Sequence, residues 1–177
     1  MFILSLILPQ IFLLPLIQFN EIIIADFQIW RLVTSMFLHG DLQHLIYNLM
    51  GILWFGAVVE DLYEKWQYLT IYFVSGVFGS LFTLIILPPA TLSLGASGAV
   101  YGLVAVVFLQ LYRQDQFTLI LGIVYLAASF IGSLAPGVNL WAHLFGFAGG
   151  ALCHYIFKKR IQRNYAQSGR RVVYHRR

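Results

Sequence analysis

The chain has 177 residues, of which 60% are hydrophobic and only 10% are charged, with a formal net charge of +4 and a mean hydropathy of +0.80. A typical soluble domain carries about 25% charged residues. This composition leaves too little polar surface for a water-facing shell, so it excludes a soluble globular protein and predicts lipid as the outer solvent.

Apolar stretches long enough to cross a bilayer, or nearly so, recur along the chain. A helix needs about 20 apolar residues to span the hydrocarbon core. Runs of that length without alternating polar residues exclude a membrane β-barrel. We therefore predict an all-α polytopic membrane protein, a bundle of six transmembrane helices. The predicted spans are residues 2–19, 42–59, 67–87, 97–112, 117–134 and 138–157.

The first span is the least typical of the six, because it contains Pro9 and Pro15. A cleaved signal peptide is the alternative, but no basic segment precedes the apolar run, which favours a retained helix. Short connections between the spans predict one membrane domain over residues 1–157. Residues 158–177 are expected to form a basic, disordered cytoplasmic tail.

The basic residues predict the orientation of the chain in the membrane. Eight of the eleven lysines and arginines lie in residues 158–177, which contain no Asp or Glu. By the positive-inside rule this tail is cytoplasmic. Counting back through six spans places Lys65 and Arg113 inside as well, and only Arg31 outside. The tail is expected to touch anionic lipid and not nucleic acid, because no nucleic-acid-binding fold accompanies it.

Four polar side chains in the spans are functional candidates, because polar groups are costly inside a bilayer. His44 and Asn48 are four residues apart in the second span and share one helix face. Ser97 opens the fourth span, and His143 lies near the start of the sixth. Each also has an ordinary explanation: a serine bonded to its own helix, a packed histidine, or an asparagine that joins two helices.

The depths of Ser97 and His143 favour a shared site. Ser97 lies eight residues after Pro89, His143 lies seven after Pro136, and both spans run from the outer side inward. Both helices also carry small residues at a spacing of four, which lets helix backbones approach closely. These residues are Gly98 and Gly102 in one span, and Ala142, Gly146 and Gly150 in the other. We therefore expect the two helices to pack face to face, with the Ser97 and His143 side chains within hydrogen-bond reach.

This pair predicts a hydrolase site. A serine hydroxyl is a weak nucleophile until a neighbouring base accepts its proton. No Asp or Glu lies in the last three spans, so we predict a Ser97–His143 dyad, with the imidazole held by an aromatic ring such as that of Tyr101. Candidate oxyanion donors are the Ser97 N–H at a helix start and the side chains of His44 and Asn48. No metal site and no cofactor are predicted.

The motifs that carry these residues resemble those of the rhomboid family of intramembrane serine proteases. Four of them occur in the family's order and cover nearly the whole bundle. They are the first-loop pattern from Trp30 to His39, the HxxxN pattern from His44 to Asn48, the GxSG motif from Gly95 to Gly98, and the AHxxG motif from Ala142 to Gly146.

The resemblance implies a six-helix core around a water-filled cavity that opens to the outer side. It implies Ser97 as the nucleophile and His143 as the general base. The supporting positions that it implies are the oxyanion donors His44, Asn48 and the Ser97 N–H, the loop glycines Gly95 and Gly98, and the Tyr101 ring stacked on His143. It further implies single-pass membrane proteins as substrates, and it suits the simplest prokaryotic members, which lack added domains.

Three other functions compete with this interpretation. The main alternative is a catalytically inactive rhomboid-like protein that binds membrane clients. Such relatives usually lack the serine or the histidine, and both are present here. A transporter is disfavoured because the polar residues stop about halfway across the bilayer. A lipid-cleaving serine hydrolase would use the same dyad, and a lipid-hydrolysis assay would distinguish it.

Overall fold

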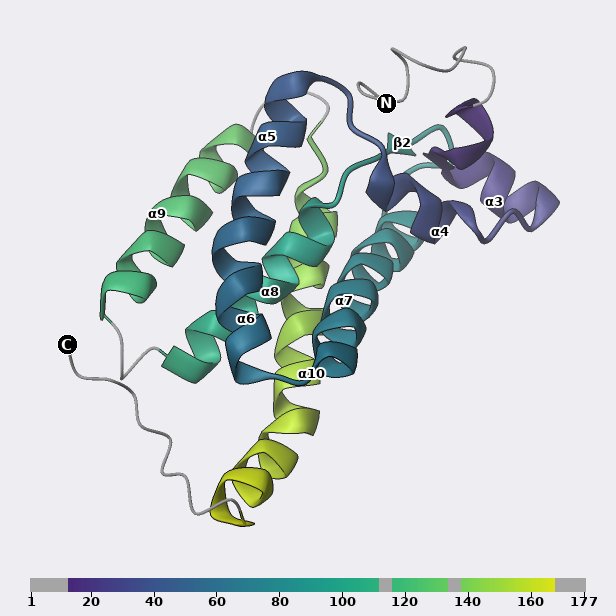
Figure 1. Ribbon diagram of the computed structural model, residues 1–177. Coiled ribbons are helices and arrows are strands. Elements are labelled where there is room, and N and C mark those ends of the chain that lie inside the picture. The colour runs from purple at the N-terminus through teal and green to yellow at the C-terminus, as the bar shows by residue number, and fades with distance from the viewer. Residues whose placement is uncertain (1–12, 112–115, 134–137, 168–177) are drawn as a thin grey trace.

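The computed structural model describes residues 13–111, 116–133 and 138–167, and these are almost entirely helical (Figure 1). The α-helices are α3 (Asn20–Asp26), α4 (Arg31–Thr34), α5 (Leu42–Gly51), α6 (Ala57–Leu62), α7 (Lys65–Ile86), α8 (Ser97–Leu111), α9 (Gln116–Ser133) and α10 (Leu140–Gln167). The short elements are the 3-10 helices η1 (Leu14–Leu16) and η2 (Ser35–Phe37), the π-helix η3 (Ile52–Gly56), and the strands β1 (Gln18–Phe19) and β2 (Leu92–Ser93).

The second to sixth predicted spans all form helices, and the second consists of α5, η3 and α6 in succession. Three helical stretches in the described ranges are long and apolar enough to cross a bilayer: Leu42–Leu62, Lys65–Ile86 and Leu140–Lys158. Two shorter apolar stretches, Ser97–Gln110 and Leu119–Ala128, lie in α8 and α9. The architecture is therefore that of an all-helical, polytopic membrane protein.

The first predicted span, residues 2–19, lies mostly outside the described residues, and its last part differs from the prediction. Leu14–Leu16 form a single 3-10 turn, and Gln18–Phe19 pair in antiparallel fashion with Leu92–Ser93. Pro15 has no backbone N–H to donate within a helix, and the strand pairing engages the backbone that follows. The prediction of a helix as far as residue 19 was therefore wrong.

Helix α10 continues past residue 157, where the membrane domain was expected to end. The segment from Lys158 to Gln167 is helical, and it contains neither Gly nor Pro. Lys, Arg, Gln and Ala, which dominate it, are good helix formers. The structure thus differs from the expected disorder up to Gln167, and residues 168–177 lie outside the described ranges.

Helices α7, α8 and α10 pack against one another at the centre of the bundle, as Figure 1 shows. Helix α8 is the most enclosed of the three, with every residue from Ala99 to Val107 buried. Such a helix is apolar on all sides because it has protein neighbours on all sides. In Figure 1, α9 lies at the edge of the bundle beside α5, and α3 and α4 flank one end of α7.

Glycine makes the contact between α8 and α10 unusually close. A Cβ atom added to Gly146 would lie 2.2 Å from the carbonyl oxygen of Gly98, and one added to Gly150 would lie 2.2 Å from that of Gly102. Any side chain at Gly146 or Gly150 would therefore push the two backbones apart. The predicted face-to-face packing of these two helices is confirmed.

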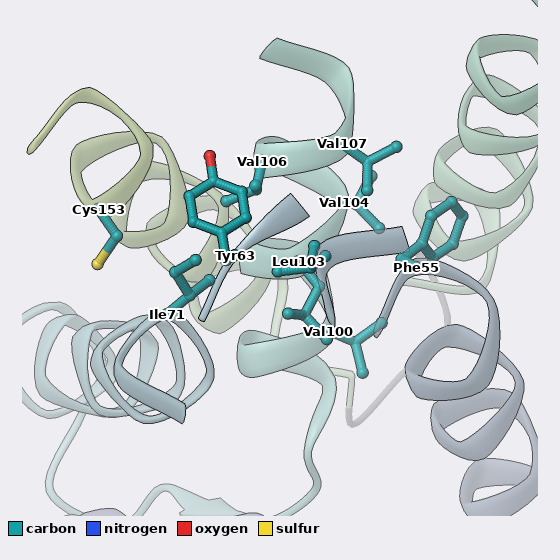
Figure 2. Close-up of a cluster of buried hydrophobic side chains, with 10 residues drawn as sticks. Phe55, Tyr63, Ile71, Val100, Leu103, Val104, Val106, Val107 and Cys153 are labelled. Atoms are coloured by element: carbon teal, nitrogen blue, oxygen red, sulfur yellow. The ribbon is translucent and has the colours of Figure 1, made fainter. Parts of the chain in front are cut away.

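A cluster of buried side chains packs around the middle of α8 (Figure 2). Tyr63, in the short connection between α6 and α7, takes part in it, and its hydroxyl lies 2.7 Å from Nδ1 of the buried His154. This hydrogen bond ties the connection to α10. The buried members are Phe55, Val59, Tyr63, Ile71, Val100, Leu103, Val104, Val106, Val107 and Cys153.

Candidate active site

Ser97 is the first residue of α8, directly after a tight turn. In that turn Gly95 has φ = +119°, a backbone conformation that side chains disfavour. A Cβ atom there would also lie 2.7 Å from two ring atoms of His44. The Gly95 N–H donates to the carbonyl oxygen of Ser35 at 3.0 Å, which fixes the turn to η2. Glycine at this position thus allows both the turn and the approach of His44.

The structure brings Ser97 and His143 together, although they lie 46 residues apart in the chain. Nε2 of His143 is 2.9 Å from Oγ of Ser97, within hydrogen-bond distance. His143 lies in the first turn of α10, and only 7% of its surface is exposed. The close glycine contacts between α8 and α10 allow the two side chains to approach each other.

Tyr101, one helical turn after Ser97, holds the imidazole from the side. Its ring stacks on that of His143, with the two centroids 4.4 Å apart and the planes 7° from parallel. A stacked neighbour restricts rotation of the imidazole. The ring edge that carries Nε2 is thereby kept toward Ser97.

His44 and Asn48 lie in α5, which packs against α8. Asp41 caps α5, and its carboxylate accepts a 2.7 Å hydrogen bond from the His44 N–H. The His44 ring lies against Gly95, two residues before Ser97. Asn48 is buried, and its Nδ2 donates to the His44 carbonyl oxygen at 2.8 Å, so one of its two amide hydrogens remains for another acceptor.

His39 supports this side of the site from the loop before α5. Its ring meets that of His44 edge to face, with centroids 5.2 Å apart. The pKa of His39 is lowered to about 4, mainly by burial and in part by the adjacent His44, while Asp41 acts in the opposite direction. The His39 ring is therefore neutral at physiological pH, and it adds no positive charge beside His44.

The chemistry available at this site is acyl transfer. A hydroxyl hydrogen-bonded to an imidazole is the arrangement that activates serine for attack on a carbonyl carbon. In the described ranges, no three His, Cys, Asp or Glu side chains are placed to bind a metal ion. The described structure thus places an imidazole on the Ser97 hydroxyl and the His44 ring beside the turn that precedes it.

Sequence reasoning missed one polar residue next to the site, Asn139. Its Oδ1 accepts a 3.1 Å hydrogen bond from the Ala142 N–H, which makes it the N-cap of α10. An asparagine just before an apolar helical run is a recognised start signal, so the capping role could have been read from the sequence. Its hydrogen bonds to α7 and β2 could not have been predicted from the sequence.

The fold and this pair define a class of protein: a polytopic helical membrane protein with a serine and a histidine in contact inside the bundle. Residues 26–160 match the Rhomboid domain family. The chain is 34% identical over 150 residues to the rhomboid-family protein YdcA of Bacillus subtilis (strain 168), an alignment that covers 80% of this chain and 74% of YdcA.

Two eukaryotic relatives match over shorter parts of their own length. Rhomboid-like protease 3 of Toxoplasma gondii is 34% identical over 141 residues, which is 74% of this chain and 53% of the relative. Rhomboid-type serine protease 2 of Emericella nidulans is 33% identical over 132 residues, which is 71% of this chain and 26% of the relative. The chain therefore belongs to the rhomboid family, the class of intramembrane serine proteases.

Proposed function

We propose that this chain is an active endopeptidase that cuts membrane-spanning segments of other proteins, with Ser97 as the nucleophile and His143 as the general base. The observation that carries the proposal is the 2.9 Å contact between His143 Nε2 and Ser97 Oγ. The imidazole accepts the hydroxyl proton as Oγ attacks the scissile carbonyl, then donates it to the leaving amine. A water molecule, deprotonated by the same imidazole, hydrolyses the acyl-enzyme.

The proposal assigns stabilisation of the oxyanion to three donors: the Ser97 N–H, the His44 ring and the Asn48 amide. The first lies in the first turn of a helix, where no carbonyl of that helix accepts the N–H and the positive end of the dipole favours negative charge. The His44 ring reaches the turn before Ser97. Gly95 and Gly98 are assigned to the tight loop and helix contact, and Tyr101 to holding the imidazole.

The proposed substrates are single-pass membrane proteins. A dyad inside a bundle whose outer faces are apolar is suited to a chain that arrives through the bilayer. The large exposed apolar side chains of η3 and α9, such as Leu53 and Ile131, support contact with lipid or with such a chain. No cofactor enters the proposed reaction.

We extend the proposal to the topology of the chain. Residues 1–157 form the membrane domain with six spans, and residues 158–177 form a basic segment on the cytoplasmic side of a prokaryotic cell membrane. Basic residues gather at one end of the bundle, which supports this orientation: Trp66, next to Lys65, meets Phe157, next to Lys158, with ring centroids 5.3 Å apart. In this orientation the dyad faces the outer side of the membrane.

The proposed activity is tested with purified protein in detergent and a generic single-pass substrate. Wild type is compared with Ser97→Ala, and with Ser75→Ala as a matched control. Ser75 is fully buried on α7 against Gly102, and its Oγ has no hydrogen-bond partner among the described residues. Cleavage by wild type and Ser75→Ala, and none by Ser97→Ala, is expected. Cleavage by Ser97→Ala would refute the assigned nucleophile.

A fluorophosphonate probe separates the inactive client-binding alternative from a poor choice of substrate. Such probes react with activated serines and need no peptide substrate. Labelling of Ser97 without cleavage would show an activated serine that requires a different substrate. Absence of both labelling and cleavage would favour the client-binding function.

A further inference from the structure

The start of α10, which carries His143, is held to α7 and β2 by hydrogen bonds from one side chain. Asn139 donates from Nδ2 to Oγ1 of Thr83 at 2.8 Å and to Oγ of Ser93 at 3.0 Å. Its Oδ1 accepts from the Ala142 N–H at 3.1 Å. One amide group thus joins α10, α7 and β2. Thr83, its partner on α7, is completely buried.

The hydroxyl of Thr83 determines which way this amide faces. Thr83 Oγ1 donates its only proton to the Gly79 carbonyl oxygen at 2.8 Å, so toward Asn139 it can only accept. The Asn139 amide must therefore direct its NH₂ group at Thr83. Its carbonyl oxygen is then left to cap α10 through the Ala142 N–H.

The residue before His143 is also held by its backbone. A Cβ atom at Gly79 would lie 2.5 Å from the Ala142 carbonyl oxygen, and one at Gly98 would lie 3.3 Å from it. The carbonyl therefore sits between α7 and α8, beside Gly98, the residue that follows Ser97. The Gly79–Thr83 turn of α7 thus contacts α10 twice, through this backbone approach and through Asn139.

We propose that Thr83 and Asn139 are positioning residues for His143, and that they set the distance of its imidazole from Ser97 by fixing the first turn of α10. This inference rests on the proposed function. Neither residue touches the reacting atoms, so they act through His143. A displacement of about 1 Å between catalytic groups can reduce the rate by about 10²-fold, so a small shift of this turn has a measurable effect.

The test combines cleavage kinetics with fluorophosphonate labelling of Ser97. Thr83→Val removes the hydroxyl with little change in shape, and Thr83→Ser restores it. Asn139→Asp keeps the capping oxygen but has no N–H for Thr83. Thr70→Val is the matched control, because Thr70 lies on the same helix and makes the same bond to the carbonyl four residues earlier, at 2.8 Å, on an exposed surface.

We expect Thr83→Val and Asn139→Asp to lower both kcat and the labelling rate about 10- to 100-fold, with KM within about twofold of wild type. Thr83→Ser and Thr70→Val should stay within about threefold of wild type. The final extent of labelling counts the folded molecules, so an unchanged extent with a slower rate separates positioning from loss of folded protein.

Three results would overturn the inference. Wild-type kcat in Thr83→Val or Asn139→Asp would show that the amide link does not position the base. A loss only in the extent of labelling, with an unchanged rate, would show a purely structural role. Absence of cleavage and labelling in the wild type itself would refute the proposed function, and with it the role assigned here.

Discussion

At the scale of single residues, Asn48 is the site residue whose role is easiest to separate from folding. Its amide donates one hydrogen to the His44 carbonyl oxygen of its own helix, and the proposed function assigns the other to the developing oxyanion. Loss of one such donor lowers kcat by about 10²–10³-fold in a known serine protease. Asn48→Ala is expected to lower kcat by about 10²-fold in a cleavage assay with little change in KM.

The prediction for Asn48 can be contradicted by the same kinetic measurement. A decrease below about threefold in kcat would mean that this side chain is not an oxyanion donor. Its Oδ1 is buried without a hydrogen-bond partner in the described ranges, so removal of the amide carries little penalty for folding. Unfolding in detergent, measured in parallel, should therefore change little.

His39 gives the site a predicted dependence on pH. Its pKa is lowered to about 4 in the folded protein from an ordinary value near 6.5, mainly by burial. Between these values the unfolded chain binds more protons, so the folded state loses stability as the pH falls from about 6.5 toward 4. From pH 7 to pH 5 this group should contribute a loss of about 2 kcal/mol.

The measurement for His39 is the free energy of unfolding at pH 7 and pH 5, for wild type and for His39→Gln. Other histidines titrate in both proteins, so the informative quantity is the difference between the two pH effects. The wild type should lose about 2 kcal/mol more than the variant. Equal losses would show that His39 is not buried in its neutral form.

At the scale of elements, the contact between α8 and α10 determines whether the dyad forms. A methyl group at Gly146 would lie 2.2 Å from the Gly98 carbonyl oxygen, and backbone atoms cannot rotate away as a side chain can. Gly146→Ala should lower stability by about 1–3 kcal/mol and slow the labelling of Ser97. Thermal unfolding in detergent and the labelling rate are the two measurements.

Gly132 in α9 is the matched control for Gly146. No atom lies within 4 Å of a Cβ atom placed there, so Gly132→Ala adds a methyl group in open space. It should leave labelling unchanged and slightly favour the helix, by up to about 1 kcal/mol. Similar effects of the two substitutions would contradict the account of helix packing.

The contact of α8 with α10 could be predicted from the sequence. Small residues at a spacing of four allow close helix packing, and each helix has such a pair: Gly98 and Gly102, and Gly146 and Gly150. The same spacing placed Ser97 and His143 on facing helices. The π-helix Ile52–Gly56 was out of reach, since nothing in its apolar sequence distinguishes it from the α-helices on either side.

At the scale of the whole molecule, the features that could not be predicted are contacts between distant segments. Asn139 meets Thr83 across 56 residues, and Tyr63 meets His154 across 91. The pairing of Gln18–Phe19 with Leu92–Ser93 likewise has no signature in two strands of two residues each. Hydropathy predicts where the helices lie along the chain, but it does not predict which polar side chains of distant segments come into contact.

Orientation in the membrane is the prediction that belongs to the whole chain. If basic residues set it, a green fluorescent protein fused after Arg177 should fluoresce in bacteria, and an alkaline phosphatase fused there should be inactive. The reverse pattern would place the dyad on the cytoplasmic side. Replacing the basic residues of 158–177 with Gln in the same fusions tests whether those charges are the cause.

The central claim is that His143 activates Ser97, and the most direct test maps a fluorophosphonate label by mass spectrometry in wild type and in His143→Ala. The 2.9 Å contact predicts a label on Ser97 in the wild type, formed about 10³-fold or more slowly in the variant. A label on another serine, or equal rates in the two proteins, would contradict the account.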